Sequence, residues 1–138
     1  MTVSETPEPR DAHAENGLLI PEGSTLVHIG PPKTATTAVQ GAFWAALEDV
    51  AQQGVDYPGR SRHSAAAAIA ALGRPGMFSD SDQPATKRWE TLRAQIVGSP
   101  LPRVVLSSEF LADATHDQIA PLLDSLRRPH VHVVITLR

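Results

Sequence analysis

A short run near the start of the sequence combines the groups that bind an oxyanion. The run reads HIGPPKTATT over residues 28–37, where Lys33 supplies an ammonium and Thr34, Thr36 and Thr37 supply hydroxyls. It follows an apolar segment and precedes a helical pattern, so its backbone amides are expected at the positive end of a helix. These features predict a loop that binds a phosphate or a sulfate.

The run is not a Walker A loop. That motif needs Gly-x-x-x-x-Gly-Lys-Ser/Thr, whereas Pro32 precedes Lys33 here. A kinase or NTPase would also need a magnesium-binding Asp at the end of a later strand. No Asp follows the apolar runs that end at residues 29, 107 and 137. Both observations count against a nucleotide-binding kinase or NTPase, which we keep as the alternative function.

Further polar residues follow two other apolar, β-rich runs. Ser108 and Glu109 follow RVVLS (103–107), and Arg138 follows VHVVITL (131–137). Glu109 is a candidate general base, but a carboxylate at a strand end can equally cap a turn or pair with a surface Arg. Ser108 is equally suited to forming a local turn. The guanidinium of Arg138 suits a bidentate contact with phosphate.

β-rich and helical patterns alternate along the chain. Apolar runs predict buried strands at 24–29, 103–107 and 131–137, and helical spacing predicts helices at 34 to about 53, at 64–72 and at 86–97. Residues 55–62 resemble a loop. Thr115 and Gln118 have the spacing of a capping box, and the helix there kinks or begins at Pro121. This alternation predicts an α/β protein in three layers, with a parallel sheet covered on both faces.

In such a sheet, ligands bind at the carboxyl ends of the strands. The Gly30 to Thr37 loop, Ser107 to Glu109 and Arg138 are all predicted to lie at strand ends. The sequence therefore predicts a single site built from these three places.

Length and composition limit the remaining possibilities. The 138 residues suit one domain, and we expect a disordered tail at 1–17 before a domain at 18–138. Twelve basic against fifteen acidic residues give a net charge of −3, which argues against nucleic-acid binding. There is no secretory signal and no apolar stretch long enough for a membrane span, so we expect a cytoplasmic protein.

The run IGPPKTATT, with Gln40 in the helix after it and the later turn VDYPG, resembles the 5′-phosphosulfate-binding loop of sulfotransferases that use 3′-phosphoadenosine 5′-phosphosulfate (PAPS). It is most similar to bacterial sulfotransferase-family proteins, whose loop often reads Pro-Lys-Thr-Gly-Thr-Thr. The resemblance implies a sheet of the P-loop nucleoside-triphosphate-hydrolase-like type. It also implies PAPS as co-substrate, no metal, and an acceptor hydroxyl on a carbohydrate or another small molecule.

The resemblance assigns roles to individual residues. Lys33 would lie beside the oxygen that bridges phosphate and sulfate, Thr36 and Thr37 would bind the 5′-phosphate, and Arg138 the 3′-phosphate. Glu109 matches the glutamate base of carbohydrate-directed members. The full set assigned to the cofactor is Gly30, Pro32, Lys33, Thr34, Ala35, Thr36, Thr37, Ser108 and Arg138.

One residue departs from the family pattern, because Ala35 stands where the family usually has glycine. If the position needs a geometry that only glycine adopts easily, the methyl group obstructs the approach of the backbone to the phosphate. If Ala35 lies in the first turn of the helix, it costs little.

The histidines suggest structure rather than a metal site. His28, His130 and His132 lie in or beside apolar strands, without paired carboxylates at ligand-like spacing. His63, with Arg60 and Arg62, lies where related proteins keep substrate-side residues, and plain loop positions are equally consistent.

The family motif that begins at Arg138 continues with a serine further along, which this sequence does not contain. We therefore expect the N-terminal portion of a sulfotransferase domain with an incomplete sheet. We also expect that these 138 residues alone do not transfer sulfuryl groups. A non-catalytic fragment is the third interpretation.

Overall fold

Four parallel strands form one sheet in the order β2-β3-β1-β4. The computed structural model describes residues 19–59, 64–74, 84–126 and 128–137. The strands are β1 (Ser24–Ile29), β2 (Val55–Asp56), β3 (Arg103–Ser107) and β4 (His130–Ile135). The predicted strands at 24–29 and 103–107 are confirmed, and β1 pairs with β3 on one side and with β4 on the other.

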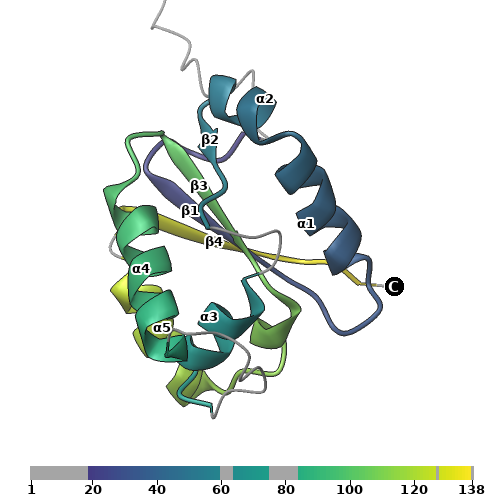
Figure 1. Ribbon diagram of the computed structural model, residues 1–138, viewed down its shortest axis with the longest axis vertical. Helices are drawn as coiled ribbons and strands as arrows, with labels where there is room; N and C mark the ends of the chain where they lie inside the picture. The colour runs from purple at the N-terminus through teal and green to yellow at the C-terminus, as the bar shows by residue number, and fades with distance from the viewer. Residues whose placement is uncertain (1–18, 60–63, 75–83, 127, 138) are drawn as a thin grey trace, which may run out of the picture.

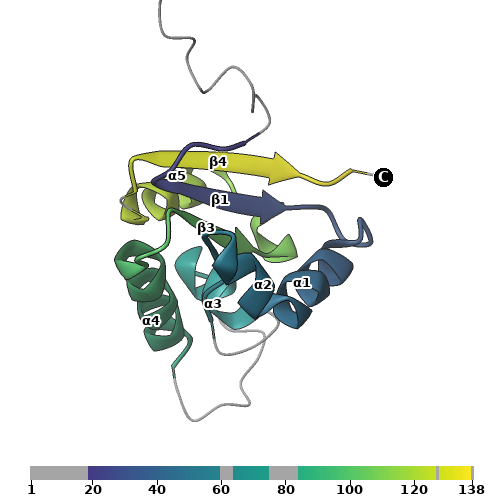
Figure 2. The ribbon, with the colours of Figure 1, turned by 90° about the horizontal axis from the view of Figure 1, so that it is seen from above.

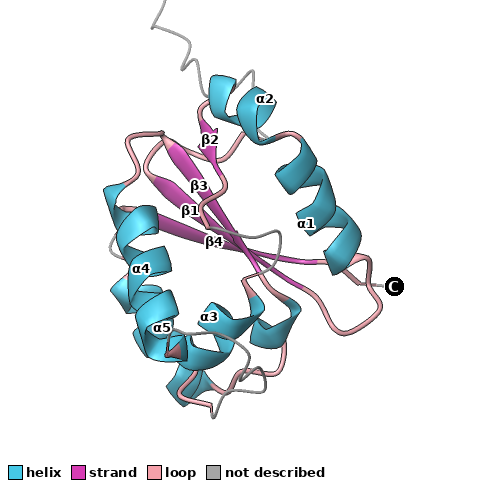
Figure 3. Cartoon of the chain, viewed as in Figure 1, coloured by secondary structure: helices cyan, strands magenta, loops and turns pink. Residues whose placement is uncertain are grey.

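Helices flank this sheet on both faces (Figures 1 and 3). They are α1 (Thr36–Ala45), α2 (Leu47–Gln52), α3 (Ala65–Ala71), α4 (Ala85–Gly98), α5 (His116–Ser125) and the short 3-10 helix η1 (Glu109–Leu111). In Figure 1, α1 and α2 lie on one side of the strands, and α3, α4 and α5 lie on the other. The α/β class and the all-parallel sheet are as the sequence predicts.

The handedness of the crossovers explains this division. The chain steps from β1 to β2 across β3, and from β3 to β4 in the opposite direction across β1. Because crossovers between parallel strands are right-handed, connections that run in opposite directions cover opposite faces. The connection through α1 and α2 therefore covers one face, and the connection through α5 covers the other.

The hydrophobic core lies between the sheet and the helices α3, α4 and α5. Alternate residues of the central strands face it, so Val27 of β1 and Val104 and Leu106 of β3 are almost fully buried. Apolar side chains of the helices complete the cluster, among them Ala68, Leu72, Leu92, Ile96, Leu122 and Leu126. The opposite face of the same strands carries Leu26 and Val105 and, toward the strand ends, the polar His28 and Ser107, which belong to the site described below.

The segment after the anion loop differs from its prediction. A single helix from residue 34 to about 53 is wrong, because α1 begins at Thr36 and a break at Ala46 separates it from α2. The buried side chains of α1 are Thr36 and Gln40, whereas the predicted apolar face is only partly buried. The break contains no glycine or proline, so no local signal marks it. Phe43 of α1 stacks on the buried Tyr57, with ring centroids 5.2 Å apart.

The predicted loop at 55–62 begins with a short strand. Residues Val55–Asp56 pair with β3 as the edge strand β2, in register with Arg103 and Val104. Two residues are too few for an alternating pattern to be visible in the sequence. Arg60, Arg62 and His63 lie outside the described residues.

The last predicted strand is correct in type but wrong in burial. β4 spans His130–Ile135 and forms the outer edge of the sheet (Figure 2). Val133 and Ile135 are 49% and 55% exposed, and Leu137 beyond the strand is more exposed still. A continuous apolar run usually indicates a strand covered on both faces, and that covering is absent from the part of the chain that the structure describes.

Helix α5 runs through Pro121 and does not begin there. It starts at His116, where the Gln118 side chain accepts a hydrogen bond from the Thr115 amide, as the capping-box spacing predicts. Pro121 therefore lies inside the helix and leaves the carbonyl of Asp117 without its usual partner.

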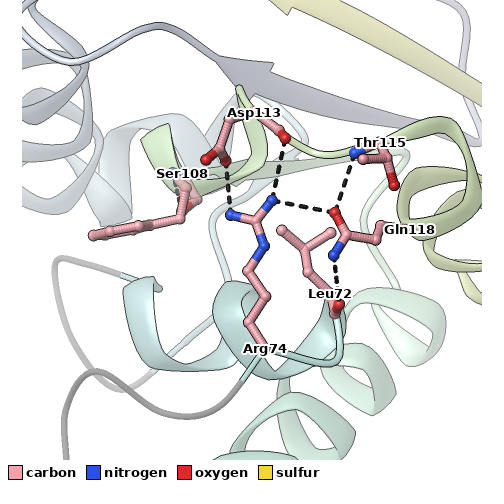
Figure 4. Close-up of polar contacts among 7 residues, drawn as sticks. Leu72, Arg74, Ser108, Asp113, Thr115 and Gln118 are labelled. Atoms are coloured by element: carbon pink, nitrogen blue, oxygen red, sulfur yellow. Dashed lines mark hydrogen bonds and ion pairs between the residues drawn. The ribbon is translucent and has the colours of Figure 1, made fainter.

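A cluster of polar contacts joins the end of α3 to the start of α5 (Figure 4). The Arg74 guanidinium donates to the Asp113 carboxylate at 2.8 Å, to the Asp113 carbonyl at 3.1 Å and to Gln118 Oε1 at 3.1 Å. Gln118 Nε2 in turn donates to the Leu72 carbonyl at 3.2 Å. These contacts fix the loop between η1 and α5 against α3.

The expected tail at residues 1–17 and the candidate phosphate ligand Arg138 lie outside the described residues. None of the described helices has the length and hydropathy needed to cross a membrane.

Candidate functional site

The predicted anion loop lies where the strand connections diverge. β1 and β3 are neighbours whose onward connections leave in opposite directions, and ligands of open α/β sheets bind in the crevice beyond the carboxyl ends of such strands. β1 ends at Ile29 and leads into residues 30–35, while β3 ends at Ser107 and leads into Ser108 and Glu109. Figure 2 shows that β1 and β4 point toward the same end of the sheet as the loop into α1. The sheet therefore brings the first two predicted places together.

The loop turns sharply between the two prolines and the helix. The Thr34 amide donates to the Pro31 carbonyl at 3.3 Å, which closes a β-turn with Pro32 and Lys33 at its centre. Lys33 has a φ of 69°, as the third residue of a type II turn requires, although glycine or asparagine is usual there. The exposed Lys33 side chain thus leaves from a left-handed backbone position.

Of the two geometries that the sequence allowed for Ala35, the structure has the left-handed one that glycine adopts easily. Ala35 is the N-cap residue of α1, with φ 66° and ψ 14°, and so lies before the first helical turn rather than in it. A left-handed conformation costs a non-glycine residue roughly 1–2 kcal/mol. Two such residues within one short loop are a concentration of backbone strain, and strain of this kind clusters at ligand-binding sites.

Gly30 permits three threonine hydroxyls to converge on the loop. A Cβ atom at this position would collide with Oγ1 of Thr136, and would lie 2.5 Å from Oγ1 of Thr34 and 2.9 Å from Oγ1 of Thr36. No side chain fits in that space without displacing these groups. Glycine at position 30 is therefore required by close packing, not by an unusual φ.

The amino end of α1 suits an anion. The amides of Ala38 and Val39 bond to the Ala35 carbonyl, and the alanine N-cap offers no side-chain acceptor to the amides before them. The positive end of the helix dipole lies at this point. This dipole would stabilise an oxyanion bound there. Thr36 is buried and Thr37 is exposed at the start of this helix.

Glu109 is held by a buried side chain of α1. Gln40 is 1% exposed, and its Nε2 donates to Glu109 Oε2 at 3.1 Å and to the Ser107 carbonyl at 3.3 Å. With the amide reversed, its oxygen would face two other acceptors, so the donor orientation is the one that the chemistry allows. Glu109 is thus directed toward α1 from the end of β3. The Ser108 hydroxyl accepts a hydrogen bond from the Phe110 amide, so it forms the local turn that the sequence allowed.

His28 links the strand ends beneath the loop. Its Nδ1 lies 2.8 Å from the Ser107 hydroxyl, and its Nε2 lies 3.3 Å from the Thr136 hydroxyl. Thr136 Oγ1 is in turn 3.3 Å from Thr34 Oγ1. Burial lowers the pKa of His28 below its ordinary value of 6.5, because desolvation penalises the charged ring. His28 is therefore a neutral, structural histidine, as the sequence predicts.

The sequence interpretation missed His28 as a participant and Thr136, and it gave Gln40 and Ser107 no role of their own in this site. Two signals were available. A polar residue within an apolar strand, such as His28, faces away from Val27 and its core neighbours. Gln40 follows Thr36 by one helical turn and therefore shares its face.

No family model matches the sequence, and no curated protein or solved structure matches it either. The function therefore has to be argued from the geometry. The site combines an exposed ammonium, a helix amino end, three hydroxyls and, on the neighbouring strand end, a carboxylate held by an amide. Such a set can bind an oxyanion and can accept a proton beside it.

Proposed function

We propose that the chain forms the phosphosulfate-binding part of a sulfotransferase that takes a sulfuryl group from PAPS. The observation that carries the proposal is the strained Lys33–Ala35 loop. It leads into α1, whose alanine N-cap makes no side-chain cap hydrogen bond, at the divergence of β1 and β3. The likeness of the run IGPPKTATT to the loops of PAPS-dependent enzymes supports the same conclusion. We also propose that the sheet is of the P-loop nucleoside-triphosphate-hydrolase-like type.

In this proposal, Lys33 stabilises the negative charge on the leaving phosphate. Sulfuryl transfer forms a bond between the acceptor oxygen and sulfur and breaks the bond from sulfur to the bridging oxygen. Negative charge then builds on the 5′-phosphate. A cation fixed beside that phosphate stabilises the transition state more than the ground state. The hydroxyls of Thr36 and Thr37 and the first amides of α1 orient the same phosphate, while the Thr34 hydroxyl donates to the Pro31 carbonyl and holds the turn.

In this proposal, Glu109 is the general base for the hydroxyl group of the acceptor substrate. Its carboxylate takes the proton of the attacking hydroxyl, so that the acceptor oxygen carries an electron pair to sulfur. The Gln40 amide binds one carboxylate oxygen, Oε2, and we assign the proton to the other, Oε1. A carbohydrate or another small alcohol is the proposed acceptor, by likeness to family members that use a glutamate base.

Calorimetric titration of the 138-residue protein with adenosine 3′,5′-bisphosphate tests the assignment. We expect weak but saturable binding that needs no magnesium, and a loss of roughly tenfold or more in Lys33→Met, since charge-assisted contacts contribute ~1.5–3 kcal/mol. Lys87→Met, an exposed substitution on α4, is the matched control. Equal affinities of wild type and Lys33→Met would remove the loop from the site.

The nucleotide-binding kinase or NTPase remains the alternative. It predicts that ADP with magnesium binds more tightly than adenosine 3′,5′-bisphosphate, and that chelation of magnesium abolishes the difference. The same titrations therefore separate the two functions. No binding of either nucleotide at millimolar concentration would favour the non-catalytic fragment.

A further inference from the structure

A chain of side-chain hydrogen bonds connects the end of β3 to the anion loop through β1 and the residue after β4. It runs from Ser107 to His28, from His28 to Thr136 and from Thr136 to Thr34, with distances of 2.8, 3.3 and 3.3 Å. Thr34 ends the chain by donating to the Pro31 carbonyl at 2.7 Å. The chain therefore terminates inside the turn that carries Lys33.

The number of hydrogens fixes the direction of this chain. The one hydroxyl hydrogen of Thr34 goes to the Pro31 carbonyl, so Thr34 can only accept from Thr136. The one hydrogen of Thr136 therefore goes to Thr34, and not to the Ile29 carbonyl, which lies 3.5 Å away and already accepts from the Thr136 amide. Because that hydrogen is used, His28 Nε2 donates to Thr136. A neutral His28 then carries its proton on Nε2 and accepts from Ser107 at Nδ1.

We propose that His28 is the positioning residue of the anion loop: as the Nε2–H tautomer it holds Thr136, and through Thr136 it fixes the Thr34 hydroxyl and the turn at Lys33. Its imidazole does not touch the anion, yet the affinity of the loop depends on it. This inference rests on the proposed function only for the identity of the ligand.

The packing around Gly30 makes this linkage specific. Oγ1 of Thr34 lies beside Gly30, 3.3 Å from Oγ1 of Thr136 and 3.5 Å from Oγ1 of Thr36, so a shift of Thr136 alters its contact with the loop threonines. His28 itself is 4% exposed and lies between the ends of β3 and β4. Its lowered pKa agrees with a ring that stays neutral and keeps an acceptor for Ser107.

Two substitutions each keep one of the two hydrogen bonds of the His28 ring and remove the other. The amide of asparagine reaches the position of Nδ1, whereas the longer glutamine places its amide nitrogen at the position of Nε2. His28→Asn keeps the Ser107 contact and loses the Thr136 contact, and His28→Gln does the reverse. We expect His28→Asn to weaken binding of adenosine 3′,5′-bisphosphate by roughly tenfold, near the upper limit for one neutral hydrogen bond, and His28→Gln to remain within about threefold of wild type.

Thr136→Val closes a double-mutant cycle. This nearly isosteric change removes the hydroxyl and should reduce affinity as much as His28→Asn does. The double variant should lose no more than either single variant, because both break the same link. Equal loss in His28→Asn and His28→Gln, or additive losses in the cycle, would overturn the proposal and leave His28 as a packing residue.

A measurement without any nucleotide separates this inference from the proposed function. Nitrogen-15 NMR of the wild-type histidines should show His28 as the Nε2–H tautomer, with a pKa below its ordinary value. In His28→Asn, the amide shifts of residues 33–36 should move, and in His28→Gln they should not. An Nδ1–H tautomer, or unmoved loop amides in His28→Asn, would contradict the positioning role even if the nucleotide binds. If no nucleotide binds but these shifts appear, the proposed function fails and the positioning role stands.

Discussion

At the scale of single residues, the site depends on backbone positions that its side chains do not favour. Lys33 and Ala35 both have left-handed φ values, and neither is glycine. At Lys33 the ammonium group accounts for a non-glycine residue at a left-handed position, because glycine there would remove the charge. Ala35 contributes no functional group, so its strain is not offset by chemistry.

Ala35→Gly is therefore expected to stabilise the fold. Relief of the left-handed penalty, roughly 1–2 kcal/mol, outweighs the greater backbone freedom of unfolded glycine, roughly 0.5–1 kcal/mol, and leaves a gain of up to about 1.5 kcal/mol. Urea unfolding followed by circular dichroism measures it. Ala42→Gly, on an exposed turn within α1, is the matched control and should lose about 1 kcal/mol. Destabilisation in both variants would show that position 35 is not left-handed in solution.

Glu109→Gln tests the proposed base. In a form of the protein that supports turnover, we expect nucleotide affinity to be retained and turnover to fall by ~100-fold or more, the usual effect of losing a general base. The exposed Glu48→Gln on α2 serves as the control. Turnover at the wild-type rate would exclude Glu109 as the base and make His63 the next candidate.

His28 should also make stability depend on pH. Its folded pKa is lowered by burial, so between that value and 6.5 the unfolded chain binds more protons than the folded one. The contribution of the neutral ring is therefore complete above 6.5 and is lost as the pH falls through the folded pKa. The free energy of unfolding of wild type should fall more steeply with acidification than that of His28→Gln. Parallel curves would contradict the lowered pKa.

At the scale of elements, the site needs α1 to be held on one face while η1 and α5 are held on the other. Gln40 connects α1 to the end of β3, and the Arg74 cluster fixes the loop between η1 and α5. Glu109 begins η1, so its position depends on both connections.

Arg74→Ala should loosen the second connection. The ion pair with Asp113 is partly exposed and contributes little alone, but the guanidinium also donates to a carbonyl and to Gln118. We expect a loss of about 1 kcal/mol in urea unfolding, and Arg74→Lys should not recover it, because an ammonium cannot reproduce the fork of donors. If Arg74→Lys kept the stability of wild type, the charge pair with Asp113 alone would account for the contribution of Arg74. Lys87→Ala on α4 is the control.

At the scale of the whole molecule, the β4 edge of the sheet is open among the described residues. Within them β4 pairs only with β1, and Val133, Val134 and Ile135 are all more than two-fifths exposed. Natural proteins protect edges of this kind with charges, bulges or covering segments, because an open apolar edge promotes association.

We therefore expect the 138-residue protein to self-associate through β4. Sedimentation analysis over a range of concentrations should show a mass that rises above that of a monomer. Replacing both Val133 and Ile135 with lysine should restore the monomer, whereas the exposed Val97→Lys on α4 should not. A wild-type protein that stays monomeric at high concentration would show that the β4 edge is protected.

The fold class and most elements could be predicted from the sequence because their signals are local. Apolar β-rich runs located β1 and β3, helical spacing located α3 and α4, and Thr115 with Gln118 located the start of α5. The residues GPPKT likewise predicted a loop before a helix, since glycine followed by two prolines interrupts a strand wherever it occurs.

The remaining features depend on contacts between residues that are far apart in the sequence. The break at Ala46, the pairing of β2 and the exposure of β4 follow from neighbours that no local window contains. The same is true of the site. His28, Ser107 and Thr136 are ordinary polar residues in the sequence, and only the strand order β3-β1-β4 brings them into one hydrogen-bonded chain. Residue types and spacing thus determined which loop could bind an anion, whereas the groups that hold it in place were decided by the tertiary structure, because hydrogen bonds depend on distance in space.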